Sequence, residues 1–315
     1  NKGLETQIKI TTKPYMVFGS IVHFGSQYMW LNWEKYMSSG NKYVVSFFHG
    51  KPEDGGEVEI HIDKFLESVQ RLHKVVTAST LVEQRLLNWG VPAEKLIKIP
   101  LGVNTSFFTL PNKNQKSVIR NLLGIPEDVI VIGSFQKDGT GWKNGLEPKL
   151  IKGPDLFVST LKLLSEKGYP VFALLTGPAR GYVKNNLKSN GIPFFHTYPS
   201  DHNDLKALYH ALDIYLITSR EEGGPMGLLE SIACGTAVAS TKVGMAQDVI
   251  NDKVNGVISY ETDAEYIAQK VEYLINMTPK QKTDMIKEAR KSAIKFDWEI
   301  VAKDHWEKIY KPLIS

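Results

Sequence analysis

The sequence contains little cysteine, no long apolar run and no strong charge of either sign. Cys234 is the only cysteine among 315 residues, so an internal disulfide is excluded and nothing indicates an oxidising compartment. No apolar run approaches the roughly 20 residues that a membrane-spanning helix needs. The net charge of +4 is compatible with docking on an anionic membrane or substrate, but it does not indicate nucleic-acid binding.

Sequence patterns that would indicate particular cofactors are also missing. No Gly-x-Gly-x-x-Gly follows a predicted strand, which argues against a dinucleotide-dependent dehydrogenase. No Asp-x-Asp pair is present and the histidines show no metal-ligand spacing, so we expect neither a bound metal nor a cofactor. The sequence starts at Asn1 without a signal-peptide pattern, so we expect a cytoplasmic protein, with membrane association as a further option.

The length of the chain and its hydrophobic pattern predict a two-domain α/β protein. Hydrophobic residues make up 42% of the chain and charged residues 23%, as in ordinary soluble proteins, and 315 residues suggest two domains. Short apolar runs alternate with helical patterns, which is typical of parallel α/β architecture. The predicted strands are 15–22, 43–48, 74–77, 129–134, 171–176 and 213–218, and the predicted helices are 80–89, with Thr80 as its N-cap, 155–168 and 205–211.

The most informative segment is 220–231, in which two glutamates flank a glycine-rich turn. Gly223 and Gly224 allow the backbone to approach a ligand, and Pro225 suits the first position of a helix. The amides that follow would point out of the positively polarised helix N-terminus, where a phosphate or diphosphate fits. Glu230 lies further along this apolar helix, where it could accept hydrogen bonds from hydroxyls of a nucleotide sugar. A plain helix start with two ordinary glutamates is the alternative.

This segment resembles the signature of family-4 retaining glycosyltransferases of the GT-B fold, also described as glycosyl transferases group 1. The signature has a serine, two variable residues, Glu-Gly and a second glutamate after seven residues, which here are Ser219, Glu222-Gly223 and Glu230. Other features of the family follow in the expected order: a strand, helix and Ile-Pro-x-Gly-Val-Asn motif within 76–108, a Cys-Gly turn and strand at 233–240, Val243-Gly244, 247–250 and Asn255-Gly256.

The resemblance implies two Rossmann-like domains with parallel sheets that face across a cleft. Residues 1–108 would form the acceptor-side domain, 109–296 the nucleotide-sugar-binding domain, and 297–315 a helix that packs back on the first domain. The polar segment 109–123 would connect the domains. The first domain is unusually short, and the family's opening strand with its glycine loop has no clear counterpart. Either this domain is naturally small or the numbered chain lacks its beginning.

The resemblance also assigns the donor site. A Lys-Gly pair binds the donor diphosphate in this family, which identifies Lys152, and the glycine-rich helix start adds Gly223, Gly224, Met226, Gly227 and Leu228. Glu230 would bind the ribose and Glu222 the sugar. The family's arginine in the loop after the preceding strand is missing here, because the strand continues as Gly133-Ser134-Phe135-Gln136-Lys137. We therefore expect Lys137 or Lys143 to supply the second positive charge, although the Gly-rich loop that follows could also be a plain mobile turn.

Other candidates would contact the base, the sugar or the acceptor. Thr197 follows a short strand, and its backbone could bind the edge of the base. His49, in Phe-His-Gly, is expected to contact the sugar or acceptor, because Gly25 occupies the place where many family members have a second histidine after the one matched by His23. Trp142 could stack on a sugar. A packed, hydrogen-bonded histidine is the alternative for His49 and His23, and a loop residue without a ligand is the alternative for Thr197.

The function implied is that of a retaining, metal-independent glycosyltransferase of the hexosyltransferase type, active in glycan biosynthesis. Its catalytic residues would be Glu222, His49 and Lys152, and the leaving phosphate would take the proton of the acceptor. The donor would be a nucleoside-diphosphate sugar, and the acceptor a glycan, a lipid-linked molecule or a small molecule. Two alternatives stay open: a nucleotide-sugar epimerase of the same fold, and a degenerate homologue that only binds a nucleotide.

Overall fold

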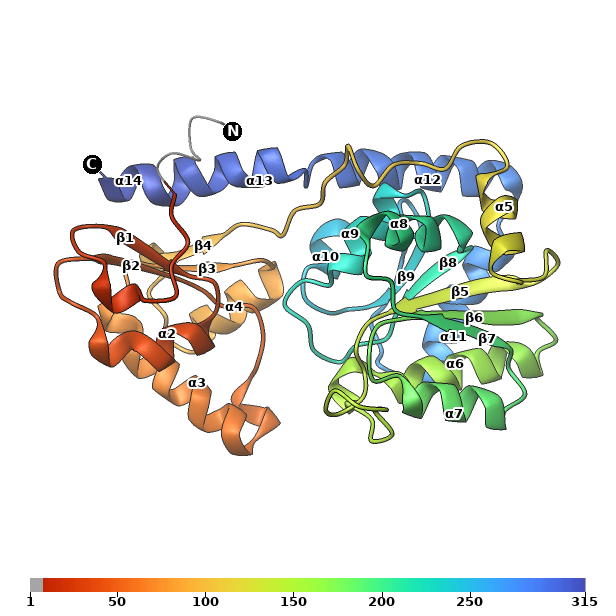
Figure 1. Ribbon diagram of the computed structural model, residues 1–315, viewed down its shortest axis with the longest axis horizontal. Helices are drawn as coiled ribbons and strands as arrows, with labels where there is room; N and C mark the ends of the chain where they lie inside the picture. The colour runs from red at the N-terminus through yellow and green to blue at the C-terminus, as the bar shows by residue number, and fades with distance from the viewer. Residues whose placement is uncertain (1–7, 315) are drawn as a thin grey trace. The chain divides into compact units, whose positions relative to one another are not determined.

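The computed structural model describes residues 8–314, which form two compact units (Figure 1). The first unit contains the residues up to Leu101 together with those from Trp298 onward, and the second unit is Gly102–Asp297. The boundary expected after Phe108 thus differs from the observed one. Hydrogen bonds explain this difference, because Val103 N–H donates to Phe296 O at 2.8 Å and Thr105 Oγ1 donates to Asp297 Oδ2 at 2.5 Å.

The first unit is built on a parallel sheet whose four strands follow one another in chain order: β1 (Ile21–Phe24), β2 (Lys42–Ser46), β3 (Lys74–Thr77) and β4 (Leu96–Lys98). Successive side chains of a strand point to opposite faces of the sheet. Val44 and Val45 accordingly enter two different apolar clusters. The apolar runs of these strands therefore reflect burial on both faces.

Helices from opposite ends of the chain cover the two faces of this sheet. The cluster on one face includes Trp30, Phe65 and Leu86, which come from the helices α2 (Gln27–Trp33), α3 (Gly56–Ser68) and α4 (Thr80–Asn88). The other face packs against Val301 and Ile309 of the C-terminal helical segment, drawn in blue in Figure 1. This segment comprises α13 (Trp298–His305), a π-helical turn (Trp306–Tyr310) and α14 (Lys311–Ile314).

His23 in β1 fixes the C-terminal segment to the sheet. Its Nδ1 lies 2.7 Å from Tyr310 Oη and its Nε2 lies 3.0 Å from Ser46 Oγ. Burial lowers the pKa of His23 from 6.5 to about 4, and the nearby His305 acts in the same direction. The ring is therefore neutral at pH 7 and both of its nitrogens are engaged within the first unit. This geometry favours the packing alternative for His23 over a contact with a sugar or acceptor.

Two local predictions for the first unit were wrong. The strand expected over 15–22 begins only at Ile21, because Pro14–Met16 forms a 3₁₀ turn. The N-cap of α4 is Ser79 rather than Thr80, since Ser79 Oγ accepts the N–H of Val82 at 3.2 Å. Ser79 and Thr80 are adjacent, and both residue types are favoured N-caps, so the residue type alone could not decide which of them caps α4.

The second unit has a six-stranded parallel sheet in the order β10-β9-β8-β5-β6-β7. The chain builds one half outward from β5 and then returns to the other side of β5 to add β8. The point where the direction of strand addition reverses is where open α/β sheets bind ligands, beyond the carboxyl ends of the strands. The strands are β5 (Ile130–Phe135), β6 (Val171–Thr176), β7 (Phe194–Thr197), β8 (Ile214–Ile217), β9 (Ala237–Thr241) and β10 (Val257–Ser259).

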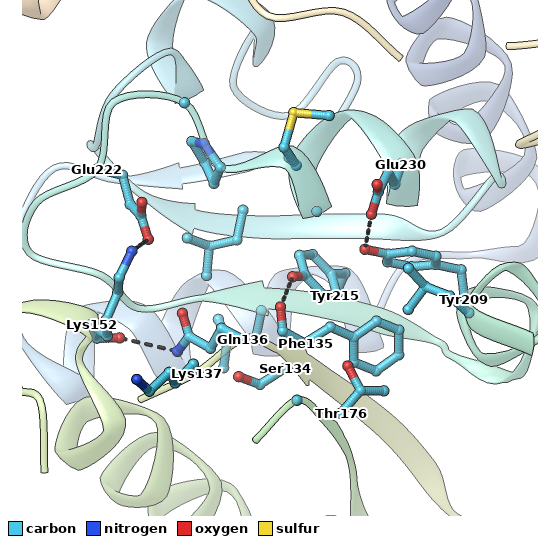
Figure 2. A pocket seen from close by; sticks show the side chains of 18 of the residues that line it. Ser134, Phe135, Gln136, Lys137, Lys152, Thr176, Tyr209, Tyr215, Glu222 and Glu230 are labelled. Carbon is cyan, nitrogen blue, oxygen red and sulfur yellow. Dashed lines mark hydrogen bonds and ion pairs between the residues drawn. The ribbon is translucent and has the colours of Figure 1, made fainter. Parts of the chain in front are cut away.

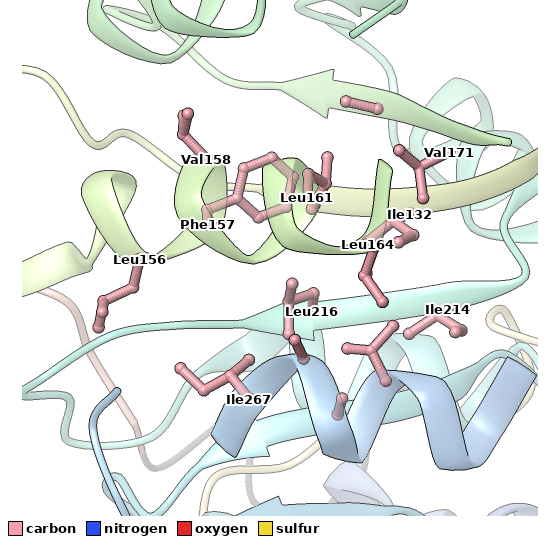
Figure 3. Packing of buried hydrophobic residues seen from close by; sticks show 14 of the residues in the cluster. Ile132, Leu156, Phe157, Val158, Leu161, Leu164, Val171, Ile214, Leu216 and Ile267 are labelled. Atoms are coloured by element: carbon pink, nitrogen blue, oxygen red, sulfur yellow. The ribbon is translucent and has the colours of Figure 1, made fainter. Parts of the chain in front are cut away.

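Helices cover both faces of the second sheet (Figure 1). On one face lie α6 (Pro154–Glu166), α7 (Gly181–Ser189) and α11 (Ala264–Ile275), and on the other lie α5 (Gln115–Leu122), α8 (His202–Ala211), α9 (Met226–Ala233) and α12 (Pro279–Ile294). The short helix α10 (Ala246–Val249) follows β9. Figure 3 shows the core of the first face, where Phe157 and Leu161 of α6 pack over Ile132 of β5 and Leu216 of β8.

The segment 109–123, expected to connect the domains, contributes instead to the second unit. Its helix α5 packs against α8. Arg120 Nη2 and Lys116 Nζ each lie 2.6 Å from the carboxylate of Asp213, at the start of β8. The lysines and polar residues that suggested a linker therefore include the groups that hold α5 in place. None of the helices in the described part of the chain has the length and apolar character needed to cross a membrane.

The environment of His23 predicts that the first unit loses stability in acid. The unfolded chain binds a proton at His23 near pH 6.5, whereas the folded chain does so only near pH 4. Stability should therefore be complete above about pH 6.5 and fall by up to about 3 kcal/mol as the pH approaches 4. Urea unfolding followed by tryptophan fluorescence measures this unit, because every tryptophan except Trp142 lies in it.

The control for this prediction is a pair of glutamine substitutions. His23→Gln keeps two hydrogen-bonding groups but does not titrate, so it should flatten the dependence of the unfolding free energy on pH between 4 and 6.5. His202→Gln, at an exposed position in the second unit, should leave the dependence as in the unaltered chain. An equal acid loss in all three proteins would contradict the assignment to His23.

Candidate functional site

A pocket of about 410 Å³ lies in the second unit where β5 and β8 end (Figure 2). Residues from the ends of β5, β6 and β8 form one side of it, and the glycine-rich turn with the start of α9 forms the other. The reversal point of the sheet thus coincides with the segment that sequence motifs identified. Of the residues predicted for the site, the pocket is lined by Lys137, Lys152, Glu222, Gly224, Met226, Gly227 and Glu230.

The start of α9 differs by one residue from the prediction. Pro225 is the N-cap, and Met226 is the first helical residue. The N–H of Leu228 donates to Pro225 O at 3.0 Å, so Leu228 does not offer its amide to a ligand as expected. The helix start lies directly on Tyr215, because a Cβ added to Gly227 would be 2.1 Å from Tyr215 Oη. Gly227 is therefore needed for this close packing.

Lys152 and Glu222 form an ion pair at one end of the pocket. Lys152 Nζ lies 2.5 Å from Glu222 Oε1, and Ser219 Oγ donates to the same oxygen at 3.1 Å. The side chain of Lys152 is 28% exposed and that of Glu222 is 14% exposed, so both face the pocket from a partly desolvated position. Electrostatic interactions at such positions are stronger than on an open surface.

Backbone contacts explain why these two side chains meet. Gly153 has a positive φ of 64°, and a Cβ at this position would lie 1.9 Å from Thr218 O. Thr218 Oγ1 donates to Gly153 O at 2.8 Å, and the N–H of Arg220 donates to Ile151 O at 2.8 Å. Arg220 also forms a two-point ion pair with Asp155 at 2.8 and 2.6 Å. The Lys-Gly pair is thus required here for geometry as well as for charge.

Glu230 lies at the other end of the pocket, against an aromatic wall. Tyr209 Oη donates to Glu230 Oε2 at 2.7 Å. Burial raises the pKa of Glu230, and the Tyr209 hydrogen bond acts in the opposite direction. The ring of Tyr209 packs against Phe135 and Tyr215 at centroid distances of 4.8 and 5.5 Å. Glu230 is therefore a partnered carboxylate in an apolar helix, as its surroundings in the sequence required.

The two lysines considered as substitutes for the family's arginine have different positions. Lys137 lines the pocket, and its Nζ lies 3.7 Å from the ring centroid of Trp142. Lys143 is exposed on the hairpin that follows β5 and does not line the pocket. Trp142 is 78% exposed and does not itself line the pocket, whereas its neighbour Lys137 does. Among the described residues that line the pocket, Lys137 and Lys152 are the two that carry positive charge.

Three predicted donor-site residues do not line this pocket. They are Gly223, Leu228 and Thr197. Thr197 is the last residue of β7, beside Thr176 of β6, and the following residue Tyr198 lines a neighbouring cavity of about 160 Å³. Thr176 and Leu205 line both cavities, so the two cavities are adjacent.

The candidates in the first unit lie at the carboxyl ends of its strands. Gly25 follows β1 directly, and a Cβ there would meet only Met29 Sδ, at 3.9 Å. His49 is exposed after β2, and its backbone carbonyl accepts a hydrogen bond from Gln27 Nε2 at 3.0 Å. Tyr28 stacks on His61 at 3.9 Å and lies 6.4 Å from the ring of His49. The roles of Gly25 and His49 in binding a sugar or acceptor stay predictions.

Sequence reasoning missed several residues that shape the pocket: Phe135, Gln136, Tyr209 and Tyr215. Tyr209 lies in α8, on a different element from its partner Glu230, so no spacing along the chain indicates the contact. Gln136 donates from Nε2 to the backbone carbonyl of Lys152 at 3.1 Å, again across two loops. In residues 8–314, no group of three or more His, Cys, Asp or Glu side chains is placed to hold a metal ion.

The chain has two α/β units, each built on a parallel sheet, and its similarity to solved structures shows that this is the GT-B fold. The structure is similar to HepE of Anabaena, solved in complex with UDP-glucose, with a TM-score of 0.77 and 18% identity over 92% of this chain and 78% of that one. It is also similar to sucrose-phosphate synthase of Thermosynechococcus elongatus, with a TM-score of 0.76 and 19% identity over 93% and 73% of the two chains.

Residues 145–292 match the family model of glycosyl transferases group 1, and this segment belongs to that family. The chain is also 25% identical over 254 residues to a D-inositol 3-phosphate glycosyltransferase of Jonesia denitrificans. That match covers 76% of this chain and 57% of the relative, so the chain spans little more than half of the length of this relative. The family predicted from the residue motifs is thereby confirmed for the segment that lines most of the pocket.

Proposed function

We propose that this chain transfers a sugar from a nucleoside-diphosphate sugar to an acceptor hydroxyl, with retention at the anomeric carbon and without a metal ion. One observation carries the proposal: a single pocket brings together a helix start, two lysines and two partly buried carboxylates. These groups match the parts of the donor, which has a diphosphate between a ribose and a sugar. HepE, whose fold this chain shares, was solved with UDP-glucose bound.

The diphosphate would lie between the start of α9 and the two lysines. Bond breaking at the anomeric carbon places negative charge on the leaving phosphate, and groups that are already oriented stabilise such charge most effectively. Lys152 and Lys137 supply two positive charges, and the first turn of α9 adds the amides of Met226 and Gly227 and the helix dipole. We propose that this is enough for the reaction to proceed without a metal, so activity should persist in the presence of a chelator.

Glu222 would contact the sugar and Glu230 the ribose. Glu222 is held toward the pocket by Lys152 and Ser219, where it can accept hydrogen bonds from sugar hydroxyls and support positive charge on the ring. Because its pKa is raised by burial, Glu230 should lose its charge at a higher pH than an exposed glutamate. Nucleotide affinity should therefore fall as the pH is lowered through that raised pKa. The leaving phosphate would take the proton of the acceptor, as in the family.

The remaining roles complete the proposal. The transferred group would be a hexose, and the acceptor a glycan, a lipid-linked molecule or a small molecule, in a step of glycan biosynthesis. His49 would contact the sugar or acceptor, and Trp142, exposed beside the pocket residue Lys137, would stack on a sugar. A cytoplasmic location, with peripheral membrane contact as a further option, belongs to the same proposal, and cell fractionation tests it.

A screen of UDP-, GDP- and ADP-linked sugars tests the function directly. At a given concentration, a donor that binds more tightly raises the unfolding temperature more, so one nucleotide series should stabilise the chain. The stabilising donor is then incubated, as a labelled sugar, with pooled glycan, lipid-linked and small-molecule acceptors, and the anomeric configuration of the product is determined. An isomerised donor without acceptor would instead indicate an epimerase, and binding without transfer or hydrolysis would indicate a degenerate homologue.

Removal of the two carboxylates should have different kinetic effects. Glu222→Gln removes a group needed most when the ring carries positive charge, so we expect kcat to fall by about 10²-fold with a smaller change in donor affinity. Glu230→Gln removes a charged ribose acceptor, so we expect the Kd of the nucleoside diphosphate to rise by about tenfold. Steady-state kinetics and calorimetry measure both effects. Glu261→Gln, at an exposed position, is the matched control, and unchanged kinetics in both test variants would remove the assignment.

Alanine substitutions should show which of the two lysines after β5, Lys137 or Lys143, contributes to donor binding. Lys137→Ala removes a pocket-lining charge, so donor affinity should fall by about tenfold, the value of one hydrogen bond to a charged group. Lys143→Ala alters an exposed residue outside the pocket and should leave donor affinity unchanged. Calorimetric titration of the stabilising nucleoside diphosphate measures both. Unchanged affinity in the Lys137 variant would show that this lysine does not replace the family's arginine.

A further inference from the structure

One arginine of the second unit is completely enclosed beneath the pocket loops. The side chain of Arg180, in the loop between β6 and α7, has no exposed area. Its Nη1 lies within hydrogen-bond distance of three carbonyls: Ser134 at 2.6 Å, Thr176 at 2.7 Å and Gln136 at 3.1 Å. A guanidinium can bind several acceptors at once because its five N–H groups form a rigid planar fork. Arg180 therefore joins the carboxyl ends of β5 and β6.

Asp138 balances the buried charge of Arg180. Arg180 Nε lies 2.9 Å from Asp138 Oδ1, and both side chains are fully buried. Removing either partner would leave an unpaired charge in the interior, which is strongly unfavourable. The backbone carbonyl of Asp138 also accepts the N–H of Lys149 at 2.8 Å. The ion pair thus holds Asp138, and the backbone hydrogen bond from Lys149 closes the hairpin 138–149, which carries Trp142.

Both lysines that line the pocket are connected to this ion pair, Lys137 as the neighbour of Asp138 in the chain and Lys152 through Gln136. Lys137 lies between Gln136, whose carbonyl binds Arg180, and Asp138, whose carboxylate pairs with it. Lys152 is reached through the side chain of Gln136, which donates to the backbone carbonyl of Lys152 at 3.1 Å (Figure 2). Arg180 itself is enclosed and cannot touch a ligand in the pocket. Any effect on binding must therefore pass through the two lysines.

We propose that Arg180, together with Asp138, is a positioning residue that fixes the backbone from which Lys137 and Lys152 bind one diphosphate. This inference rests on the proposed function, which supplies the diphosphate. A lysine side chain is long and flexible, so holding its backbone in place reduces the freedom lost on binding. The chain lacks the family's arginine in the loop after β5, and an enclosed arginine in the next loop supports two lysines instead.

The substitution Arg180→Lys tests the proposal while keeping the buried charge. A lysine side chain has one nitrogen, so it cannot pair with Asp138 through one group and bind the three carbonyls through another, as Arg180 does with Nε and Nη1. The probes are UDP, GDP and ADP, each compared by calorimetry with its own nucleoside. We expect the affinity for the diphosphate that the unaltered chain binds to fall by about tenfold or more. Affinity for the corresponding nucleoside, which does not reach the lysines, should change by less than about twofold.

Two further variants control for an effect on folding. Arg120→Lys alters another buried arginine of this unit, which pairs with Asp213 at 2.6 Å and donates to Ala211 O, and it should leave diphosphate affinity within about twofold. The double variant Arg180→Met with Asp138→Leu removes both charges, an exchange that often preserves stability. Thermal unfolding should show it folded, with the same selective loss of diphosphate affinity. If it does not fold, the Arg180→Lys comparison decides.

The outcomes separate this inference from the proposed function. If the unaltered chain binds none of the three diphosphates, the proposed function is wrong and the positioning role falls with it. If the unaltered chain binds a diphosphate, but Arg180→Lys weakens the diphosphate and the nucleoside equally, or weakens neither, only the positioning role is overturned. A selective loss in Arg180→Lys that is absent in Arg120→Lys supports it.

Discussion

The pocket depends on how closely two loops of the second unit approach each other. At Gly153 the backbone passes so near to the carbonyl of Thr218 that no side chain fits between them. The hydrogen bonds around this contact bring Lys152, which precedes α6, next to Glu222, which follows β8. Without this approach the positive and the negative side of the site would be separate surface features. A backbone contact, rather than attraction between side chains, therefore determines where the charges of the site meet.

Each charged side chain that lines the pocket contacts a partner within the second unit. Lys152 pairs with Glu222, Lys137 lies over the Trp142 ring, and Glu230 accepts the hydroxyl of Tyr209. These partners hold the side chains toward the pocket, and the charged groups of Lys152 and Glu222 stay partly exposed. The fully enclosed pair beneath the loops has the opposite character, because it contributes rigidity and no accessible charge. The site thus combines an accessible layer that binds with an enclosed layer that orients.

The sequence predicted the fold class, the family and the four charged residues of the pocket, and most of the misses are contacts between distant parts of the chain. Glycine spacing and apolar periodicity are local, so they indicated the start of α9 and the strands around it. The contacts of Tyr209 and Gln136 join elements far apart in the chain, and no local pattern predicts such pairs. The segment 109–123 seemed a linker because its charges have their partner, Asp213, about 100 residues later. Helix α9 begins at Met226, one residue later than predicted, because sequence patterns locate helix ends only to within a residue or two.

The covering of the first sheet by helices from both ends of the chain has a consequence for biosynthesis. All residues of the second unit precede α13 in the chain and are therefore synthesised before it. The first unit cannot be completed then, because Val44, Val76 and Ile99 still lack the helical segment that covers them. Its apolar surface stays open to chaperones or to association with other nascent chains until residues 298–314 emerge. Premature termination shortly before Trp298 would make that exposure permanent, although every residue of the proposed donor pocket would be present.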